Sequence, residues 1–192
     1  TDIDQDGFLE FAGGAEINWV TDGQGNPVVI PAGISVAAAM VWNEWNAPQT
    51  DMDFYLYYWD GQNDPVSVAA SEQEQSGQPG QAPIEEIYHE TAAEGAYGWV
   101  VFKYGGPNNP DIEFFNRFDN EPLADNVQEG SLAPPCDAAG SICVAALNAA
   151  PPFNLEPYSS KGPTNGTGGS LSGGMVKPDI SAFANVTTAS YG

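Results

Sequence analysis

Glycine and proline occur throughout the chain and limit the length of any regular element. The 192 residues include 22 Gly and 16 Pro, together about a fifth of the sequence. Both residues interrupt helices and favour turns, so this composition favours short strands over long helices. Hydrophobic residues make up 42% of the chain, with five Trp, eight Tyr and nine Phe. That is enough apolar side chain to build a core, which argues against disorder of the whole chain.

Strand-forming runs alternate with turn clusters in the first part of the chain. The runs lack helical periodicity and are rich in β-branched and aromatic residues, which fit a half-buried pleated surface. They cover residues 15–20, 28–30, 34–45, 53–59, 66–68, 84–90, 96–104 and 111–118. Strands at this spacing predict a mainly β fold, an antiparallel β-sandwich of the jelly-roll-like kind.

The composition changes near residue 120. Residues 1–120 are acidic and aromatic, whereas residues 125–192 are rich in Ala, Pro, Gly and Ser and poor in aromatic side chains. We therefore expect two regions, a β-sandwich domain over 1–120 and a second segment over 125–192.

Acidic residues dominate the charge of the chain. There are 26 Asp and Glu against four bases, a formal net charge of −22, and residues 1–102 contain no Lys or Arg. Such a surface repels nucleic acid and anionic membranes, so we expect neither as a partner. It suits either solubility in salty water or the binding of cations. No apolar run reaches about 18 residues, so no segment is predicted to span a membrane.

The start of the chain, TDIDQDGFLE, has the spacing of a calcium-binding loop. Carboxylates two residues apart, followed by a glycine that permits a sharp bend, match the first half of an EF-hand loop. The twelfth position of that motif, a bidentate Glu, is Gly13 here, so the complete motif fails and further ligands must come from elsewhere. The alternative is a solvated acidic terminus. The predicted calcium ligands are the side chains of Asp2, Asp4, Asp6 and Glu10 and the carbonyl of Phe8.

Cys136 and Cys143 are the only cysteines. Two cysteines cannot make a four-ligand zinc site alone, and the single histidine, His89, is distant in sequence. A disulfide that closes a short loop fits an exported protein, so we expect a Cys136–Cys143 disulfide and a secreted, extracellular location. Two free, buried thiols are the alternative.

Three segments of the second region resemble the subtilisin-like serine proteases, the subtilases of peptidase family S8. SSKGPT at 159–164 and KPDISAFA at 177–184 are similar to the family's stretch just upstream of the catalytic serine, commonly SS(R/K)GPT, a variable loop and KPDIxAPG. SICVAA at 141–146 is similar to the family strand vitVGA. The chain departs from the pattern at Phe183 and Ala184, where the family has Pro-Gly. The resemblance covers residues from about 131 to 192 and implies part of an α/β protease domain.

The first region resembles the bacterial pre-peptidase C-terminal domain, a β-sandwich. The similar segments are DMDFYLY at 51–57, EEI at 85–87 and GAYGWVV at 95–101. The acidic start of the chain is similar to the entry of an insertion found in some bacterial subtilases. Together the resemblances imply a sandwich inserted into a protease domain.

No complete catalytic triad is visible in the sequence. The chain has no Gly-Thr-Ser segment, and His89 lies in a Glu-rich strand without the family's Gly-Thr-His context. A triad needs a nucleophile, a base and an orienting group within hydrogen-bond reach. We therefore expect this chain alone to be inactive, as a non-catalytic accessory or insert region of a secreted serine endopeptidase. It would shape substrate access or stabilise the enzyme, with the rest of the protease domain and extracellular protein substrates as partners.

Two other functions remain open from the sequence. A free-standing extracellular module that binds protein or carbohydrate would expose an aromatic strip formed by Tyr55, Tyr57 and Trp59. A glycosidase would need a carboxylate pair, for which Glu85 and Glu86, or Asp51 and Asp53, are candidates. Adjacent residues of a strand point to opposite faces, which argues against the Glu pair, and the Asp pair is better explained as the start of a strand.

Overall fold

The computed structural model describes residues 2–22, 24–116, 122–127, 129–132, 135–170 and 172–186. The chain divides into two compact units, Thr1–Asn126 and Val127–Gly192, and each is described by itself. In these described ranges, no helix has the length and apolar character needed to cross a bilayer.

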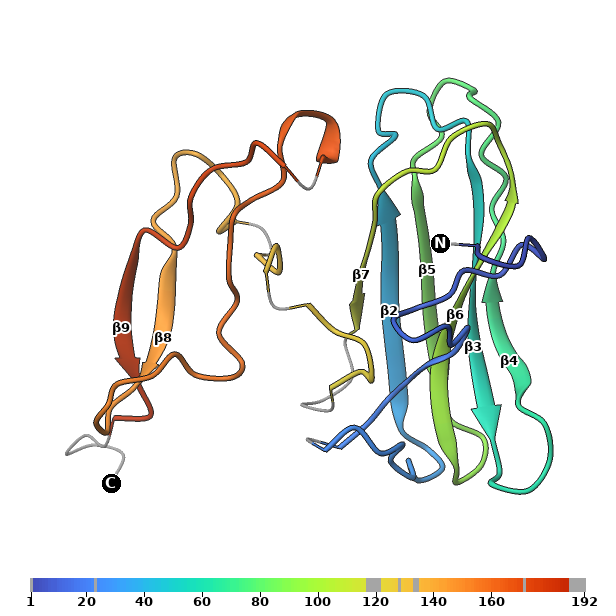
Figure 1. The fold of residues 1–192 in the computed structure, drawn as a ribbon, viewed down its shortest axis with the longest axis horizontal. Coiled ribbons are helices and arrows are strands. Elements are labelled where there is room, and N and C mark those ends of the chain that lie inside the picture. The colour runs from blue at the N-terminus through green and yellow to red at the C-terminus, as the bar shows by residue number, and fades with distance from the viewer. Residues whose placement is uncertain are drawn as a thin grey trace. The chain divides into compact units, whose positions relative to one another are not determined.

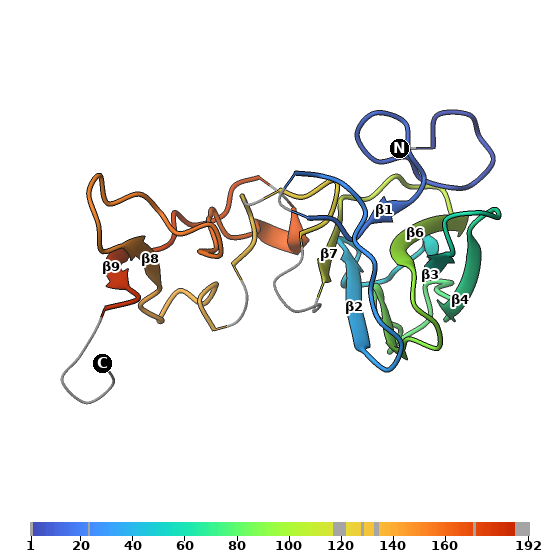
Figure 2. The ribbon, with the colours of Figure 1, turned by 90° about the horizontal axis from the view of Figure 1, so that it is seen from below.

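Two antiparallel sheets form the first unit (Figure 1). The first sheet has the order β1 (Asn18–Trp19), β6 (Ala96–Gly105), β3 (Asp51–Trp59) and β4 (Val66–Ser71). The second sheet has the order β5 (Ile84–Glu90), β2 (Ser35–Trp42) and β7 (Ile112–Asn116). Figure 2 shows the sheets as two layers of this unit. The predicted mainly β, antiparallel character is confirmed.

The core of the first unit lies between these sheets and combines aliphatic with aromatic side chains. Phe54 and Leu56 on β3 are fully buried, and the Trp99 indole of β6 stacks on Phe54 with ring centroids 5.1 Å apart. Met40 and Trp42 on β2 belong to the same buried cluster. Burial of each such side chain contributes roughly 1.5–3 kcal/mol, so this cluster is the main source of stability of the unit.

The first unit extends beyond residue 120, the end of the sandwich that the sequence predicts. Val20 forms an antiparallel bridge with Leu123, and Leu123 joins the core cluster. The buried Asn18 side chain donates to the Asp125 carbonyl (2.7 Å) and accepts from the Asp125 N–H (2.9 Å). These contacts place the segment after residue 121 in the first unit, which continues to Asn126.

Three predicted strands are shorter than expected, among them the run 34–45, which forms only β2 and ends at Trp42. The run 28–30 makes only isolated contacts, because Pro27 and Pro31 flank it and neither has an N–H for a ladder. Ile30 bridges Gly95 and no regular strand forms there. The run 15–20 contributes only β1. Residues 117 and 118, the end of the predicted strand 111–118, lie outside the described residues.

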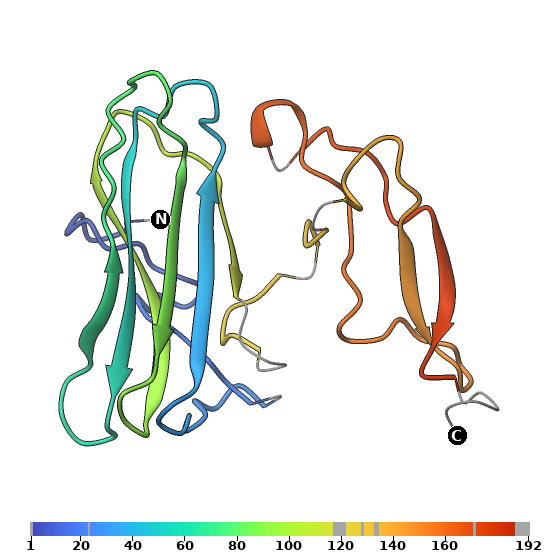
Figure 3. The ribbon, with the colours of Figure 1, turned by 180° about the vertical axis from the view of Figure 1, so that it is seen from behind.

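The second unit contains one parallel strand pair (Figure 3). β8 (Val144–Asn148) pairs with β9 (Ile180–Ala184), and the 3-10 turn η1 (Thr167–Gly169) lies between them in sequence. An antiparallel bridge between Leu147 and Leu155 adds to the other side of β8. Few apolar side chains are buried: among the described residues of this unit these are Leu132, Cys143 and Ala145. The remaining strand residues are mostly accessible.

Candidate functional site

The acidic N-terminal loop is fixed to the first sheet. Phe8 forms an antiparallel bridge with Phe102 of β6, and their ring centroids are 4.8 Å apart. Hydrogen bonds flank the bridge: Leu9 N donates to the Val101 carbonyl (2.9 Å), and Lys103 N donates to the carbonyl of residue 7 (2.8 Å). The loop therefore follows the edge of β6 with a defined backbone position.

Carboxylates converge in this loop in two overlapping groups. In each group, one oxygen from each side chain lies within 4.8 Å of the others. The groups are Asp2, Asp4 and Glu10, and Asp4, Asp6 and Glu16. The four predicted carboxylate ligands are thus divided between two groups that share Asp4: Asp2 and Glu10 lie in the first group and Asp6 in the second. The structure adds Glu16, which the sequence analysis missed because a tight turn, with Phe11 N bonded to the Ala15 carbonyl (2.7 Å), returns the chain to the loop.

Backbone N–H groups orient three of these carboxylates. Asp2 Oδ2 accepts from the N–H of residue 7 (3.2 Å), Asp6 Oδ1 accepts from Phe8 N (2.9 Å), and Glu10 Oε2 accepts from Ile3 N (2.7 Å). Asp2 Oδ1 is buried and has no hydrogen-bond partner. A buried oxygen without a partner is costly, so this atom has capacity for another ligand. The contribution of the Phe8 carbonyl stays a prediction.

Like charges repel within the cluster. Burial raises the pKa of Glu16, and the neighbouring carboxylates of Asp6, Asp4 and Glu10 raise it further. A hard divalent cation would remove this repulsion, because calcium prefers several oxygen ligands in a flexible arrangement. The two groups of carboxylates are therefore a candidate site for a hard cation.

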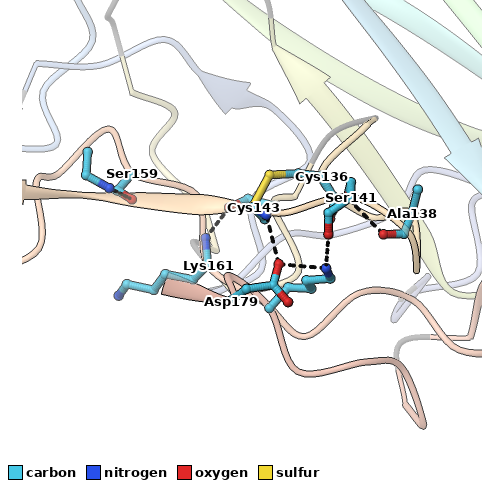
Figure 4. The surroundings of a disulfide bond; sticks show 10 residues. Cys136, Ala138, Ser141, Cys143, Ser159, Lys161 and Asp179 are labelled. Carbon is cyan, nitrogen blue, oxygen red and sulfur yellow. Dashed lines mark hydrogen bonds and ion pairs between the residues drawn. A yellow bond between two sulfur atoms is a disulfide. The ribbon is translucent and has the colours of Figure 1, made fainter. Parts of the chain in front are cut away.

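The protease-like motif of the second unit forms a polar junction beside a disulfide (Figure 4). Cys136 and Cys143 are joined by a disulfide, with their Cα atoms 4.9 Å apart. Lys177 Nζ donates to the Ser141 carbonyl and to Asp179 Oδ2, both at 2.7 Å. Asp179 Oδ2 also accepts from Cys143 N (2.8 Å). The bonds from Lys177 and Cys143 lower the pKa of Asp179, so the junction holds an ionised carboxylate.

Hydroxyl groups of the same motif bind backbone. Ser159 is buried, and its Oγ accepts from Ala146 N of β8 (3.0 Å). Thr164 Oγ1 accepts from Met175 N (2.9 Å). In the described part of the chain, neither hydroxyl contacts a histidine or carboxylate. His89 lies in the other unit, on β5. These residues fix the loops around β8 and β9 and form no triad.

The predicted aromatic strip is not freely exposed. Tyr55, Tyr57 and Trp59 are each half-buried. The Tyr55 hydroxyl donates to Glu72 Oε1 (2.8 Å), and burial raises the pKa of this phenol. The three side chains therefore form no continuous exposed surface for a ligand, although Trp59 lines a separate pocket.

The candidate glycosidase pair is also separated. Glu85 is fully buried and accepts from Gln75 Nε2 (2.7 Å), Gln73 N (3.0 Å) and the Ser71 hydroxyl. Glu86, the next residue, is exposed on the opposite face of β5. Glu85 therefore links β5 to the end of β4, and the two carboxylates cannot act on one substrate.

A comparison of the chain with protein-family models and with curated proteins finds no match in either set. A function can therefore be inferred only from the residues and contacts of the molecule itself. Two groups of contacts are the candidates for a functional role: the acidic loop beside β6 and the polar junction beside β8 and β9.

Proposed function

We propose that the chain is a non-catalytic accessory region of a secreted subtilisin-like serine endopeptidase. In this proposal the first unit is an inserted sandwich similar to pre-peptidase C-terminal domains. The second unit is the segment of the α/β protease domain that precedes the catalytic serine. The observation that carries the proposal is the parallel pairing of β8 with β9.

This pair is formed by the two segments whose sequences resemble the protease. Parallel sheets are normally covered on both faces by helices. Val144, Ile180 and Phe183, however, are 50%, 57% and 54% exposed. A two-stranded parallel sheet with such exposed side chains fits the interior of a larger α/β domain, whose further strands and helices would cover it.

The polar junction supports the same interpretation. Asp179 is bonded to Cys143 and Lys177, so the Lys-Pro-Asp-Ile segment sets the start of β9 against the start of β8. The motif then has a structural role in this chain, and catalysis would require groups outside it. The sandwich would act beside the protease domain by shaping access of protein substrates or by stabilising the enzyme.

The test is dye binding by the uncovered sheet, combined with active-site labelling. The full chain should bind an environment-sensitive apolar dye, and Phe183→Lys should lower the bound amount by about half. The matched control Tyr104→Lys replaces an aromatic residue of the first unit that is 72% exposed, and it should leave the signal unchanged. If the chain binds no dye, or if both variants lose the same amount of bound dye, then the exposed side chains of β8 and β9 do not form an uncovered apolar face. A serine labelled by a fluorophosphonate contradicts the non-catalytic role.

We also infer that calcium binds the acidic loop and stabilises the first unit. Two features support this second role: the converging carboxylates and the buried Asp2 Oδ1 that lacks a partner. A ligand that binds only the folded state adds RT ln(1 + [L]/Kd), about 2.7 kcal/mol at a hundredfold excess over Kd. Magnesium should replace calcium poorly, because it requires near-ideal octahedral geometry.

The calcium role is tested by thermal melting with calcium, magnesium and sodium chloride at matched ionic strength. Calcium should raise the melting temperature of the wild type, and Asp4→Ala should abolish the increase. Glu86→Gln removes an exposed carboxylate elsewhere in the first unit and should retain the increase. Equal effects of calcium and matched salt on wild type and Asp4→Ala would show a solvated acidic terminus.

A further inference from the structure

Two tryptophans from different strands meet on the outer face of the first sheet. The indoles of Trp19 on β1 and Trp59 on β3 have centroids 6.1 Å apart and planes inclined at 47°. They line one side of an open pocket of about 440 Å³. The remaining lining residues come from the loop after β3: Gln62, Asn63, Asp64 and Pro65.

A glycine in β6 allows the indoles to approach each other. β6 lies between β1 and β3, and Gly98 is the register partner of both Trp19 and Tyr57. A Cβ atom on Gly98 would lie 2.9 Å from Trp19 Cε3 and would also overlap Ile17. Without that atom, the Trp19 ring lies across β6 on the side of Trp59. Gly98 thus leaves the room in which the two indoles of the pocket wall meet.

The loop that forms the other wall is held in place. Trp59 Nε1 donates to the Asn63 carbonyl (2.8 Å). Asp60 Oδ1 accepts from Gln62 N (2.8 Å) and Asn63 N (2.9 Å), and these backbone bonds lower the pKa of Asp60. The ionised Asp60 therefore fixes the loop, while Asp64 is an exposed carboxylate at the pocket itself.

Aromatic faces beside an exposed carboxylate, here Asp64, favour a cationic ligand. The negative face of an indole attracts a cation, and a planar guanidinium also stacks on it. Residues 1–102 contain 17 acidic residues and no Lys or Arg, so an anionic ligand would meet repulsion without a compensating base. We propose that the Trp19–Trp59 pocket binds cationic side chains of a partner protein, arginine in particular. This inference does not depend on the second unit or on a protease parent.

The binding test uses the full chain and two short peptides at about 150 mM salt, where surface charges are screened beyond roughly 8 Å. The probe is acetyl-Gly-Arg-Gly-Arg-Gly-amide, and its neutral analogue carries citrulline in place of each arginine. The arginine peptide should shift the indole N–H resonances of Trp19 and Trp59 saturably in nuclear magnetic resonance titrations. The citrulline peptide should shift neither resonance.

Variants separate this pocket from the general acidic field. Trp59→Ala should weaken arginine-peptide binding about threefold to fivefold, in line with an exposed cation–π contact. Asp64→Asn, an exposed change that leaves both rings in place, should weaken binding about twofold. The matched controls are Trp45→Ala, at a tryptophan that is 50% exposed elsewhere, and Glu86→Gln. Neither control should change the affinity.

Two results overturn the proposal. Equal affinity of the wild type and both pocket variants, with circular dichroism showing that all are folded, means that the peptide senses only net charge. Saturable binding of neutral cellotetraose by the same indoles, without binding of the arginine peptide, means that the pocket is a sugar site.

Discussion

The two units hold their strands together by different means. The first unit buries a continuous aromatic and aliphatic cluster between two antiparallel sheets, with Trp42 and Trp99 almost inaccessible. In the second unit, buried polar residues outnumber buried apolar ones among the described residues. The polar set is Glu156, Ser159, Thr164 and Lys177, against Leu132, Cys143 and Ala145. A disulfide and side-chain hydrogen bonds therefore add to the few buried apolar side chains in the described part of this unit.

This difference concerns how well each unit covers its sheets. Antiparallel sheets bury one face against each other and can leave the other face to solvent, as the first unit does. A parallel pair is normally covered on both faces, whereas in the described residues Val144 of β8 and Phe183 of β9 are about half exposed, although Phe183 contacts the Phe153 ring. We therefore expect substitutions to destabilise the first unit by removing packing contacts. Substitutions should destabilise the second unit by removing its disulfide or its side-chain hydrogen bonds.

The largest effect is expected from Trp99→Ala. This indole is fully buried and stacks on Phe54, so its removal leaves a large cavity and should destabilise the first unit by about 3–5 kcal/mol. Denaturant unfolding followed by far-ultraviolet circular dichroism measures the loss. A loss below about 1 kcal/mol would show that the aromatic cluster is not what holds the sheets together.

A smaller effect is expected from removing the disulfide. Replacing Cys136 and Cys143 by serine releases a closed loop with a sequence separation of 7, which should destabilise the second unit by about 2–3 kcal/mol in the loop-entropy description. The melting transition of the first unit should not move. If that transition falls together with the protection of β8, then the two units are energetically coupled and the comparison fails.

Lys177→Met should destabilise the second unit by about 2 kcal/mol, because a buried ammonium that binds Asp179 and the Ser141 carbonyl is lost. The matched control is Lys161→Met. Lys161 faces Glu129 at 3.6 Å in a largely exposed pair, so its loss should cost less than about 0.5 kcal/mol. Amide exchange of β8 and β9 measures both changes. Equal effects of the two variants would contradict the role assigned to the junction.

The smallest effect concerns pH. The folded-state pKa of Glu16 is raised above its ordinary value of 4.5, so its favourable contribution is present at low pH and is lost as pH rises through the folded pKa. Without calcium, Glu16→Gln should therefore gain about 0.5 kcal/mol at neutral pH and no advantage in acid. Melting curves from acid to neutral pH in chelator test this. If the melting temperatures of wild type and Glu16→Gln differ by the same amount at every pH, the proposed repulsion between Glu16 and its neighbouring carboxylates is wrong.

Much of the first unit could be predicted from sequence because strand patterns are local. The β3 run alternates between Phe54, Leu56 and their outward neighbours, and this alternation fixes the buried face. The strand predicted at 28–30 does not form a regular ladder. Its apolar residues have a strand-like pattern, but the flanking prolines lack the N–H groups that a ladder needs. The subtilase interpretation of the second unit stays a prediction, since a parallel pair alone does not specify a fold.

The candidate sites were predictable only where their residues are close in sequence. Asp2, Asp4 and Asp6 lie within one loop, whereas Glu16 joins them through a turn that the charge pattern does not reveal. The Trp19–Trp59 contact depends on the strand order, in which β6 separates β1 from β3. Gly98 was the available signal, because glycine inside a strand often marks the close approach of another group.

The central claim, that the first unit is a well-packed sandwich whereas the parallel pair of the second unit is sparsely covered, is tested most directly by native-state hydrogen exchange on the full chain. Core strands exchange only by global unfolding, whereas strands with few buried contacts open locally. Amides of β3 and β6 should therefore exchange at least about a hundredfold more slowly than amides of β8 and β9. Equal protection of both sets, in a chain shown to be monomeric, would contradict the account.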